Sequence, residues 1–456
     1  MHENKTIAAI ATPAAAGGIG IIRISGQDAF EVADKVFKSK DASPLSCAKG
    51  YTMKYGAVYN ESELIDEAVA LVFRAPKSYT GEDVIEFSCH GGIYVLNRVL
   101  RRVIECGASP ASPGEFTKRA FLNGKIDLTQ AQAVMDIVSA QGEQAAKGAA
   151  AARDGAISRR IAEIKSPLVE LSAHMGVWSD YPDDDLPELT NEMIEEKLLY
   201  AQTKLQSLLK SFDAGKILCT GISTAIIGKP NVGKSTLMNL MAKTERSIVT
   251  SVAGTTRDIV EESVRLGKLI LRLADTAGIH ETADEVEKIG VERARERMKN
   301  SDLIIAVFDS SKELDKDDLA VLELVKNSKS IAVINKTDLE QKLDTSVIES
   351  SFGKTVYMSA KTDDNCEKLE TAAQELFELN DYDTSSGIIN NERQRQCCVR
   401  ALECVNEGVD AMQMSLTFDA INISVDCALE ALMELTGERI TTEVTDAVFE
   451  NFCVGK

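Results

Sequence analysis

The sequence predicts a multidomain protein with α/β and all-α parts. The segment 218–380 alternates apolar runs with glycine-containing loops and helical stretches, which is typical of a doubly wound, mainly parallel sheet. The flanking segments 126–217 and 381–456 place apolar residues at helical spacing, so we expect one helical domain interrupted by the α/β domain. Residues 1–125 begin with a strand–loop–strand pattern and form the third part. Three domains also suit 456 residues, at roughly 150 residues per domain.

The composition excludes several classes of protein. Apolar residues make up 44% and charged residues 27%, which is the mix of a globular rather than a disordered chain. With 51 basic against 71 acidic residues, the net charge is −20, and the mean field therefore repels nucleic acid and anionic membranes. Any phosphate group must therefore bind at a local site whose charge favours it. The ten cysteines lack CxxC spacing and the four histidines are scattered, so no zinc pattern is present, and thiols without a disulfide framework predict a reducing cytosol.

The N-terminal run 7–22 has the hydrophobicity of a signal sequence. Pro13 and three glycines lie within it, and they favour a strand–loop–strand start instead. No stretch of the chain approaches 18 apolar residues, so we expect no membrane span and a cytoplasmic location.

The helical segments are recognised by their composition and spacing. Residues 126–152 are rich in Ala and Gln and contain no proline, which favours helix strongly. Residues 191–212 carry Ile and Leu at helical spacing, with Glu and Lys between them. The same helical spacing of apolar residues recurs at 390–412 and 424–437, after the α/β segment. This recurrence predicts that the α/β domain is inserted into a helical domain, rather than a simple succession of domains.

The segment 228–235 carries the strongest motif in the chain. Its sequence, GKPNVGKS, fits GxxxxGK[ST] between an apolar strand and a helix. Glycines let backbone N–H groups surround phosphate oxygens, and the helix N-terminus adds favourable charge. We expect Lys234 to reach the β- and γ-phosphates and the Ser235 hydroxyl to bind Mg²⁺. The residues expected to contact phosphate here are Asn231, Val232, Gly233, Lys234, Ser235 and Thr236.

Four further motifs complete the pattern of a guanine nucleotide-binding domain. In DTAG (275–278), Asp275 can hold magnesium through water and the Gly278 N–H can contact the γ-phosphate. GTTRD (254–258) supplies Thr256 as a second magnesium hydroxyl. In NKTD (335–338) a carboxylate can pair with the guanine N1–H and amino group, whereas adenine leaves it unpaired; SAK (359–361) suits a base-contacting loop. The other expected nucleotide contacts are Thr250, Ser251, Val252, Ala253, Gly254, Thr255, Thr256, Asp275, Thr276, Ala277, Gly278, Asn335, Lys336, Thr337, Asp338, Ser359, Ala360 and Lys361.

The group that orients the attacking water is left open by these motifs. Ras-like GTPases place Gln directly after DTAG, whereas this chain has Ile279 and His280. Ile279 cannot position water; His280 can, although a solvent-facing histidine is the simpler interpretation. The segment 281–294 offers carboxylates instead. They are Glu281, Asp284, Glu285 and Glu287.

The whole chain resembles the MnmE (TrmE) family of tRNA-modifying GTPases. Besides the nucleotide motifs, the resemblance rests on residues 7–26, 78–92, 112–134 and the terminal CVGK of 453–456. It implies an N-terminal α+β domain (1–125) that binds tetrahydrofolate and mediates homodimerisation. It further implies a discontinuous helical domain (126–217 and 381–456) and an inserted P-loop GTPase domain (218–380).

The resemblance also implies a reaction and a partner. In a heterotetramer with the FAD-containing protein MnmG, the family adds aminomethyl or carboxymethylaminomethyl groups at C5 of the wobble uridine U34 of certain tRNAs. Methylene-tetrahydrofolate is the one-carbon donor. GTP hydrolysis in the family requires two GTPase domains to meet, and K⁺ takes the place of an arginine finger near the β- and γ-phosphates. The implied K⁺ ligands are Asn231, Thr250, Val252 and Thr255, and the implied catalytic residues are Glu287, which orients water, and Lys234.

By resemblance, the folate-binding residues are Arg23, Glu82, Lys125 and Lys456. Guanidinium and ammonium groups can hold a glutamyl carboxylate, and Glu82 can pair with the amino edge of the pterin. Each residue also has a simpler interpretation. Arg23 can be an ordinary surface residue at a strand end, Glu82 an acid at a helix N-terminus, and Lys125 a base in a loop. Cys453 stands four residues from the end, as in a prenylation signal, but Gly455 and Lys456 fit that signal poorly. It is either a reactive thiol near the folate, and so a catalytic candidate, or a buried structural cysteine.

A second class of function is a ribosome-assembly GTPase that clamps rRNA. It predicts a basic RNA-binding domain, and none is visible, because the helical segments together carry a net charge of −15. Residues 1–125 carry +1. Direct tRNA contact is therefore expected on the N-terminal domain or mainly through the partner protein; scattered solvated charges are the alternative. The basic residues considered for this contact are Arg98, Arg101, Arg102, Lys118 and Arg119.

Overall fold

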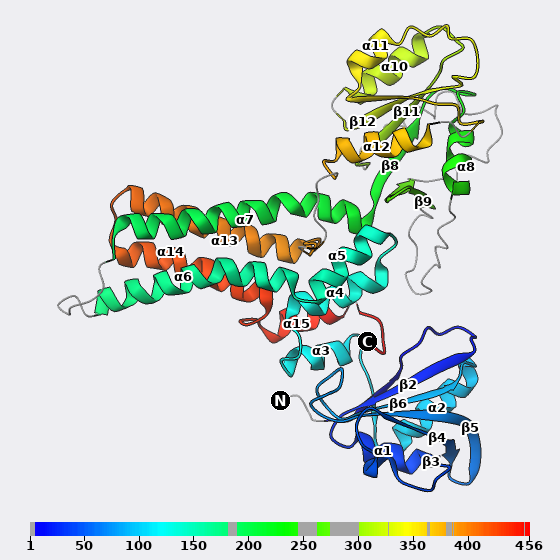
Figure 1. The fold of residues 1–456 in the computed structure, drawn as a ribbon, viewed down its shortest axis with the longest axis vertical. Helices are drawn as coiled ribbons and strands as arrows, with labels where there is room; N and C mark the ends of the chain where they lie inside the picture. The colour runs from blue at the N-terminus through cyan, green and yellow to red at the C-terminus, as the bar shows by residue number, and fades with distance from the viewer. Residues whose placement is uncertain are drawn as a thin grey trace. The chain divides into compact units, whose positions relative to one another are not determined.

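The computed structural model divides the chain into two compact units (Figure 1). The first unit comprises Met1–Met135 with Glu430–Lys456, and the second comprises Asp136–Leu429. The residues that the structure describes are 5–180, 189–244, 262–273, 301–326, 328–362, 365–379, 385, 387–450 and 452–456. The division into three domains at 1–125, 126–217 with 381–456, and 218–380 stays a prediction.

The first unit is built on a seven-stranded sheet. Its strands are β1 (Ile7–Ile10), β2 (Ile19–Ser25), β3 (Phe37–Ser39), β4 (Thr52–Asn60), β5 (Glu63–Phe73), β6 (Val84–His90) and β7 (Ser109–Pro110). They are ordered β3-β4-β5-β6-β2-β1-β7, and all pair antiparallel except β1 with β7. The register of β2 against β6 sets Arg23 opposite Glu86, which matters for the site below.

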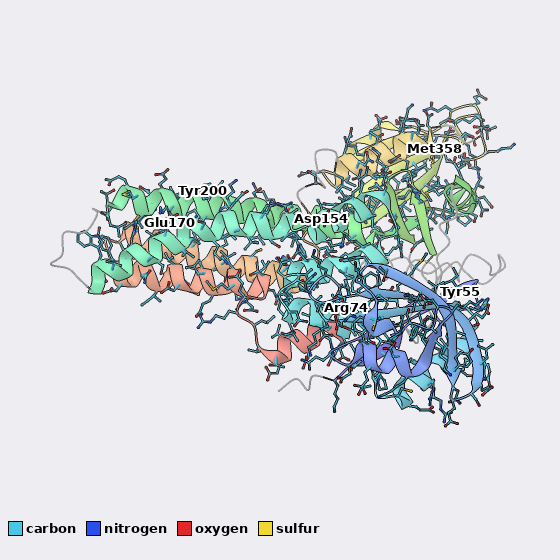
Figure 2. The ribbon with its side chains drawn as sticks, turned by 60° about the horizontal axis from the view of Figure 1, so that its bottom comes forward. Tyr55, Arg74, Asp154, Glu170, Tyr200 and Met358 are labelled. Atoms are coloured by element: carbon cyan, nitrogen blue, oxygen red, sulfur yellow. A yellow bond between two sulfur atoms is a disulfide. The ribbon has the colours of Figure 1, made fainter. Side chains whose placement is uncertain are left out.

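Two helices pack on the sheet and share the apolar core of this unit with it. Helices α1 (Ala29–Val36) and α2 (Ile93–Glu105) pack on the sheet with their buried faces, and the rings of Phe37 and Phe87 stack there with centroids 5.4 Å apart. Beside this core, the guanidinium of Arg74 lies over the Phe30 ring; Arg74 and the β4 residue Tyr55 are labelled in Figure 2. The short 3₁₀ helix η1 spans Leu45–Cys47.

A smaller core joins distant parts of the chain within the first unit. It is formed by α3 (Glu115–Leu122), the start of α4 (Leu128–Ser139) and α15 (Thr442–Phe449), together with Ile440, which follows α14 (Phe418–Thr436). Leu128 and Ala131 pack against Phe449 and Phe452. This packing brings the C-terminal residues 453–456, here called the tail, back to the N-terminal part of the chain.

The helices of the second unit include the longest in the molecule's described part. Apart from the helices that cover its sheet, this unit contains α5 (Glu143–Arg153), α6 (Ala156–Asp180), α7 (Asn191–Thr220), α13 (Glu392–Gln413) and the first part of α14. Figure 1 shows α6, α7, α13 and α14 side by side. Leu198, Leu205 and Leu208 of α7 are buried, as their spacing predicts, whereas Leu199 is 40% exposed. Glu170 of α6 and Tyr200 of α7 are labelled in Figure 2.

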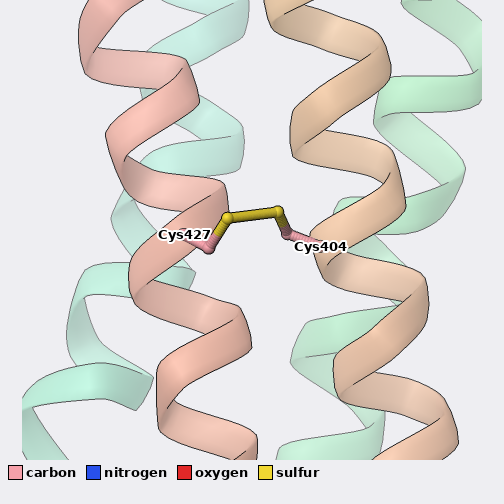
Figure 3. The surroundings of a disulfide bond; sticks show 2 residues. All are labelled: Cys404 and Cys427. Carbon is pink, nitrogen blue, oxygen red and sulfur yellow. A yellow bond between two sulfur atoms is a disulfide. The ribbon is translucent and has the colours of Figure 1, made fainter.

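The stretch 126–152 is helical, as its composition predicts, and it is divided into two helices because Gly142, with extended backbone, caps the start of α5 (φ −137°, ψ 160°). One expectation, about the cysteines, is corrected. The cysteines do not all remain free: Cys404 of α13 and Cys427 of α14 are joined by a disulfide (Figure 3). Their separation of 23 residues gave no sign of pairing.

The second unit also contains the expected mainly parallel sheet. Its strands are β8 (Ile222–Ile227), β9 (Glu262–Leu266), β10 (Leu269–Leu273), β11 (Leu303–Asp309), β12 (Ser330–Asn335) and β13 (Lys354–Tyr357). They are ordered β13-β12-β11-β8-β10-β9, with only β9 antiparallel to its neighbour.

Helices cover both faces of this second sheet. On one face α8 (Lys234–Thr244) and α12 (Cys366–Leu376) pack against a row that includes Ile305 and Val333. On the other face α10 (Lys316–Val325) and α11 (Ser346–Ser351) pack against the alternate residues, such as Ala306 and Ile334. Strands buried on both faces explain the continuous apolar runs in the sequence. The doubly wound fold is confirmed.

Candidate functional site

The loop 228–233 connects β8 to α8 and has the backbone shape that its glycines predict. Gly228 and Gly233 adopt φ of +144° and +103°, and Asn231 between them adopts +65°. A Cβ on Gly228 would lie 2.5 Å from the Val307 carbonyl oxygen. A Cβ on Gly233 would lie 2.2 Å from Asn335 Nδ2, so neither position tolerates a side chain. The loop is thereby fitted closely against β11 and the end of β12.

Lys234, the first residue of α8, points its side chain back into this loop. Its Nζ donates to the carbonyl oxygens of Gly228 (2.6 Å) and Lys229 (2.7 Å). Burial lowers the pKa of this ammonium. An ammonium held at the loop by neutral carbonyls is available to exchange them for phosphate oxygens. Ser235 and Thr236, next along the helix, are exposed, as a magnesium-binding hydroxyl and a phosphate contact require.

Asn335, at the end of β12, connects the three nucleotide motifs that the structure describes. Its Nδ2 donates to the Val232 carbonyl oxygen (2.8 Å), and its Oδ1 accepts from the Ala360 N–H (2.9 Å). The side chain is buried. One amide therefore ties the phosphate loop, the NKTD segment and the SAK segment into a single site.

Asp338, the residue expected to select guanine, is held from one side and exposed on the other. Its Oδ1 accepts from the Ser359 hydroxyl at 2.7 Å. This bond fixes the orientation of the carboxylate while leaving Oδ2 for a ligand. The arrangement suits paired donors on a base edge, such as N1–H and the amino group of guanine.

Lys336 lies between the base-binding and phosphate-binding parts. Its Nζ donates to the Asn231 carbonyl oxygen (2.8 Å) and to Asp309 Oδ2 (2.6 Å). Burial raises the pKa of Asp309, but hydrogen bonds from Lys336 and Ser311 outweigh that effect and hold the pKa below its ordinary value. The charged pair is thus stable near neutral pH and fixes the loop beside Asn231.

A second lysine of the loop, Lys229, was missed by sequence reasoning. Its Nζ contacts Asp315 Oδ2 (2.7 Å) and Asp318 Oδ2 (2.6 Å), and its side chain is only 9% exposed. Asp315 caps α10 in a reciprocal capping box with Asp318. The spacing of these two acids was a readable helix-start signal, but nothing in the sequence linked it to a variable position of the phosphate motif.

Several expected nucleotide, metal and catalytic residues lie outside the described residues. They are Thr250, Ser251, Val252, Ala253, Gly254, Thr255, Thr256, Asp275, Thr276, Ala277, Gly278 and Glu287. The alternative water-orienting residues 279–285 lie outside them too. Of the expected magnesium and potassium ligands, the structure describes Ser235 and Asn231.

The first unit contains the other predicted site. Arg23 of β2 donates from Nε to Glu86 Oε1 (2.7 Å) and from one terminal nitrogen to the Gly455 carbonyl oxygen (3.2 Å). Its guanidinium lies 5.5 Å from the ring centroids of both Tyr79 and Phe116. Arg23 and the tail are therefore brought together, as the resemblance implies.

The tail itself is seated by close backbone contacts. Gly455 has φ +93°, and a Cβ there would lie 2.3 Å from the Ile10 carbonyl oxygen. The Gly114 N–H donates to the Cys453 carbonyl oxygen at 3.3 Å. Cys453 is exposed, so it is not the buried structural cysteine considered above. Lys456, half-buried, follows directly after the seated glycine.

Glu82 and Lys125 lie on neighbouring backbone of the same unit. Glu82 accepts hydrogen bonds from the Ser25 hydroxyl (2.7 Å) and from the Arg119 guanidinium (3.1 Å). The Lys125 side chain lies against Gly81: its Cγ is 3.3 Å from the position that a Cβ on Gly81 would take. Its Nζ donates to the Pro76 carbonyl oxygen (3.0 Å). Arg119 was considered only as a tRNA contact; its salt bridge to Glu82 could not be read from spacing.

The five basic residues considered for tRNA contact are all paired with carboxylates. Arg98 contacts Glu63, Arg101 and Arg102 contact Glu105, Lys118 contacts Asp446, and Arg119 contacts Glu82 and Glu115. They do not form a free basic patch. Among the residues described, no helix is long and apolar enough to cross a membrane, and no group of His, Cys, Asp and Glu is arranged to hold a metal ion.

Comparison with known proteins identifies the family. The profile described as "GTP-binding protein TrmE N-terminus" matches residues 6–125, and that of the "MnmE helical domain" matches residues 128–453. The tRNA modification GTPase MnmE of Alkaliphilus oremlandii is 41% identical over 461 residues, and that of Listeria innocua is 42% identical over 458 residues. Each alignment covers 100% of both chains.

Solved structures match a smaller part of the chain. The G domain of the T. maritima FeoB iron transporter is 25% identical and covers 34% of this chain and 98% of its own, with a TM-score of 0.25 that is too low to argue from. The family assignment rests on the two profiles and on the full-length relatives. On those grounds, the chain belongs to the MnmE (TrmE) family of tRNA modification GTPases.

Proposed function

We propose that this chain is a Mg²⁺-dependent, K⁺-activated GTPase that acts in the modification of the wobble uridine of tRNA. The observation that carries the GTPase part is the Asn335 side chain, which joins the phosphate loop to both base-binding segments. A site built this way accepts a whole nucleoside triphosphate and selects its base through Asp338. The tRNA modification part is supported by the full-length relatives, which are tRNA modification GTPases.

The described ligands fit the proposed metals. Ser235 presents an exposed hydroxyl at the N-terminus of α8, where it can coordinate Mg²⁺ beside a bound phosphate. Asn231, in the loop 228–233, is exposed, and its backbone is fixed because its carbonyl oxygen accepts a hydrogen bond from Lys336. Since its side chain is exposed, the side-chain oxygen can bind K⁺. Thr256 for Mg²⁺, and Thr250, Val252 and Thr255 for K⁺, complete the proposed sets.

In the proposed reaction, K⁺ supplies positive charge where the triphosphate develops negative charge. Lys234 leaves the loop carbonyls and holds the β- and γ-phosphates. Glu287 orients the attacking water, since the chain has Ile279 where Ras-like GTPases have Gln. Hydrolysis occurs when the GTPase domains of a homodimer meet.

We further propose that the first unit binds tetrahydrofolate through Arg23, Glu82, Lys125 and Lys456. The second terminal nitrogen of Arg23 makes no hydrogen bond to the described residues, so it can hold a ligand carboxylate. Glu82 is already oriented by Ser25 and Arg119. Methylene-tetrahydrofolate would supply the one-carbon unit, with the exposed thiol of Cys453 beside it.

The partner proposed for this chemistry is an FAD-containing protein of the MnmG type, in a heterotetramer. Because the five basic side chains considered for tRNA contact are paired with acids, we propose that the partner holds most of the tRNA. Eight cysteines that form no disulfide support a reducing, cytoplasmic setting.

GTP turnover measured in K⁺ and in Na⁺, over a range of protein concentrations, tests the central part. We expect turnover to rise with K⁺ and with protein concentration, while nucleotide affinity changes little. Asn231→Ala should abolish the response to K⁺, and Glu287→Ala should cut turnover with GTP binding intact. Equal rates in the two salts would overturn the K⁺ mechanism, and retained turnover in Glu287→Ala would overturn the assignment of the carboxylate.

A further inference from the structure

Cys404 and Cys427 face one another across the two helices α13 and α14 (Figure 3). Their Cα atoms are 6.0 Å apart. That distance lies within the range of roughly 4.4–6.8 Å that a disulfide spans without backbone movement. We propose that this pair is a reversible dithiol–disulfide site, which a hydroperoxide oxidises and a dithiol reductant restores.

The two cysteine residues differ in exposure, and the difference assigns their roles. Cys427 is exposed on α14, whereas Cys404 is 7% exposed on α13. An oxidant from solvent therefore meets Cys427 first. Cys404 is the resolving thiol, since it is held beside its partner and shielded from solvent.

The remaining cysteines are poorer candidates for such chemistry. Cys397 and Cys398, on the same helix, are buried and adjacent, and burial raises the pKa of Cys398 to about 12. Burial likewise raises the pKa of Cys89 to about 12 and that of Cys219 to about 11. Thiols of this kind remain protonated and unreactive. Compared with these thiols the pair is the better site, because access from solvent and a second cysteine within bonding distance coincide there.

In the proposed reaction a hydroperoxide oxidises the two thiols in two steps. The Cys427 thiol is oxidised to a sulfenic acid, and the peroxide O–O bond breaks with release of one water or alcohol. The Cys404 sulfur then attacks the Cys427 sulfur, the S–S bond forms and one water leaves. Two thiols have lost two electrons and two protons in all. Thiol–disulfide exchange with a dithiol reverses the step.

The disulfide joins two helices that lead to different parts of the chain. Helix α13 begins where the chain returns from the mainly parallel sheet, and α14 leads through α15 to the tail at Lys456. A covalent bond between Cys404 and Cys427 prevents these helices from sliding past one another and constrains the unfolded chain. In a reducing compartment such disulfides are usually transient and redox-sensing rather than structural.

Peptide mass spectrometry of the full-length, folded protein tests the site directly. Trypsin alone leaves both cysteines in one peptide, 401–439, because no Lys or Arg lies between Arg400 and Arg439. Adding a protease that cleaves before Asp separates 401–409 from 426–439. After treatment with hydrogen peroxide and alkylation, we expect these fragments to remain linked, with the mass of their sum less two hydrogen atoms, and to separate in dithiothreitol.

Other outcomes of that experiment count against the proposal. Alkylation of both cysteines after peroxide overturns it, as does a sulfinic acid at Cys427 with Cys404 alkylated, or a link from Cys427 to another cysteine. Cys427→Ser should abolish the linked pair. Cys47→Ser is the matched control, because Cys47 is also exposed but unpaired, and it should leave the linked pair unchanged.

Thermal unfolding gives a second, independent measurement. The oxidised protein should melt at least about 5 °C above the reduced protein, since closing a loop of this length restricts the unfolded chain. Dithiothreitol should remove the difference in wild type and in Cys47→Ser. Cys427→Ser should show no difference, while its GTP turnover in reductant should match wild type and report an intact fold. Equal melting temperatures for oxidised and reduced wild type overturn the proposed cross-link.

Discussion

The nucleotide site of the second unit and the tail site of the first unit are assembled in opposite ways. The nucleotide site is built from short contiguous motifs at the ends of parallel strands, and its members meet because those ends share one edge of the sheet. The tail site joins Arg23 to Gly455, which are 432 positions apart, through packing of the last helix and the tail. Local backbone geometry defines the first site, and long-range packing defines the second.

The two sites also differ in how they use charge. In the nucleotide site, Lys234 rests on neutral carbonyl oxygens and Asp338 is exposed, so a ligand meets charges that are not yet neutralised. In the tail site, Arg23 and Glu82 are each already paired with another charged side chain. We therefore expect single substitutions to affect nucleotide binding more strongly than folate binding.

Asp338→Asn should give the largest effect, because it exchanges an acceptor for a donor at the base. Preference should move from GTP to xanthosine triphosphate by roughly 10⁴-fold, as expected when a hydrogen-bonding pair between site and base is mismatched. Competition between the two nucleotides for the purified protein measures this. Asp344→Asn is a control with an exposed carboxylate at the start of α11, and it should keep GTP. Unchanged GTP preference in Asp338→Asn would mean that the NKTD segment does not read the base.

Gly233→Ala should weaken nucleotide binding by at least roughly 100-fold. The new Cβ would lie 2.2 Å from Asn335 Nδ2 at φ +103°, so the loop must shift, and left-handed strain adds of order 1–3 kcal/mol. Fluorescent GTP titration measures the change. Gly353→Ala is the matched control, since its Cβ would meet only Leu376 at 3.6 Å. Equal losses in both variants would show that the effect is not specific to the phosphate loop.

Arg23→Ala should weaken binding of 5-formyl-tetrahydrofolate by about 1.5–3 kcal/mol, the range for a hydrogen bond to a charged group. Isothermal titration calorimetry measures this, and GTP affinity should stay at the wild-type value. Arg98→Ala removes an arginine from an exposed pair with Glu63 and serves as the control. Wild-type folate affinity in Arg23→Ala would assign Arg23 to structure alone.

The smallest effect concerns His90, at the end of β6. A hydrogen bond that the protonated His90 ring donates to the Asp66 carboxylate, together with the charge of that carboxylate, raises the pKa of His90 above 6.5. The pair therefore adds stability that is fully present below pH 6.5 and is lost as the pH rises through the raised pKa. Because His90 is exposed, the change should be slight. An NMR titration should show the raised pKa and its fall in Asp66→Asn; an ordinary pKa in wild type would exclude the pair.

The same contrast explains what the sequence could and could not predict. The doubly wound sheet and the grouping of Lys234, Asn335, Asp338 and Ser359 follow from strand and loop patterns that lie close together in the chain. The contacts of Lys229 with Asp318, of Arg119 with Glu82 and of Cys404 with Cys427 depend on packing between elements far apart. No periodicity or motif encodes such packing. The break at Gly142 could not be located from the sequence, because a single glycine within a segment of strong helix propensity does not by itself end a helix.

Deletion of residues 453–456 tests the central claim most directly, because it removes the tail from one site and nothing from the other. Binding of 5-formyl-tetrahydrofolate and of a non-hydrolysable GTP analogue should be measured by calorimetry on the same truncated protein. We expect folate binding to fall by at least about 10-fold, as the charge of Lys456 and the seated backbone of Gly455 are lost, while the GTP analogue binds as in wild type. Wild-type folate affinity in the truncated protein would contradict the account of a site completed by the tail.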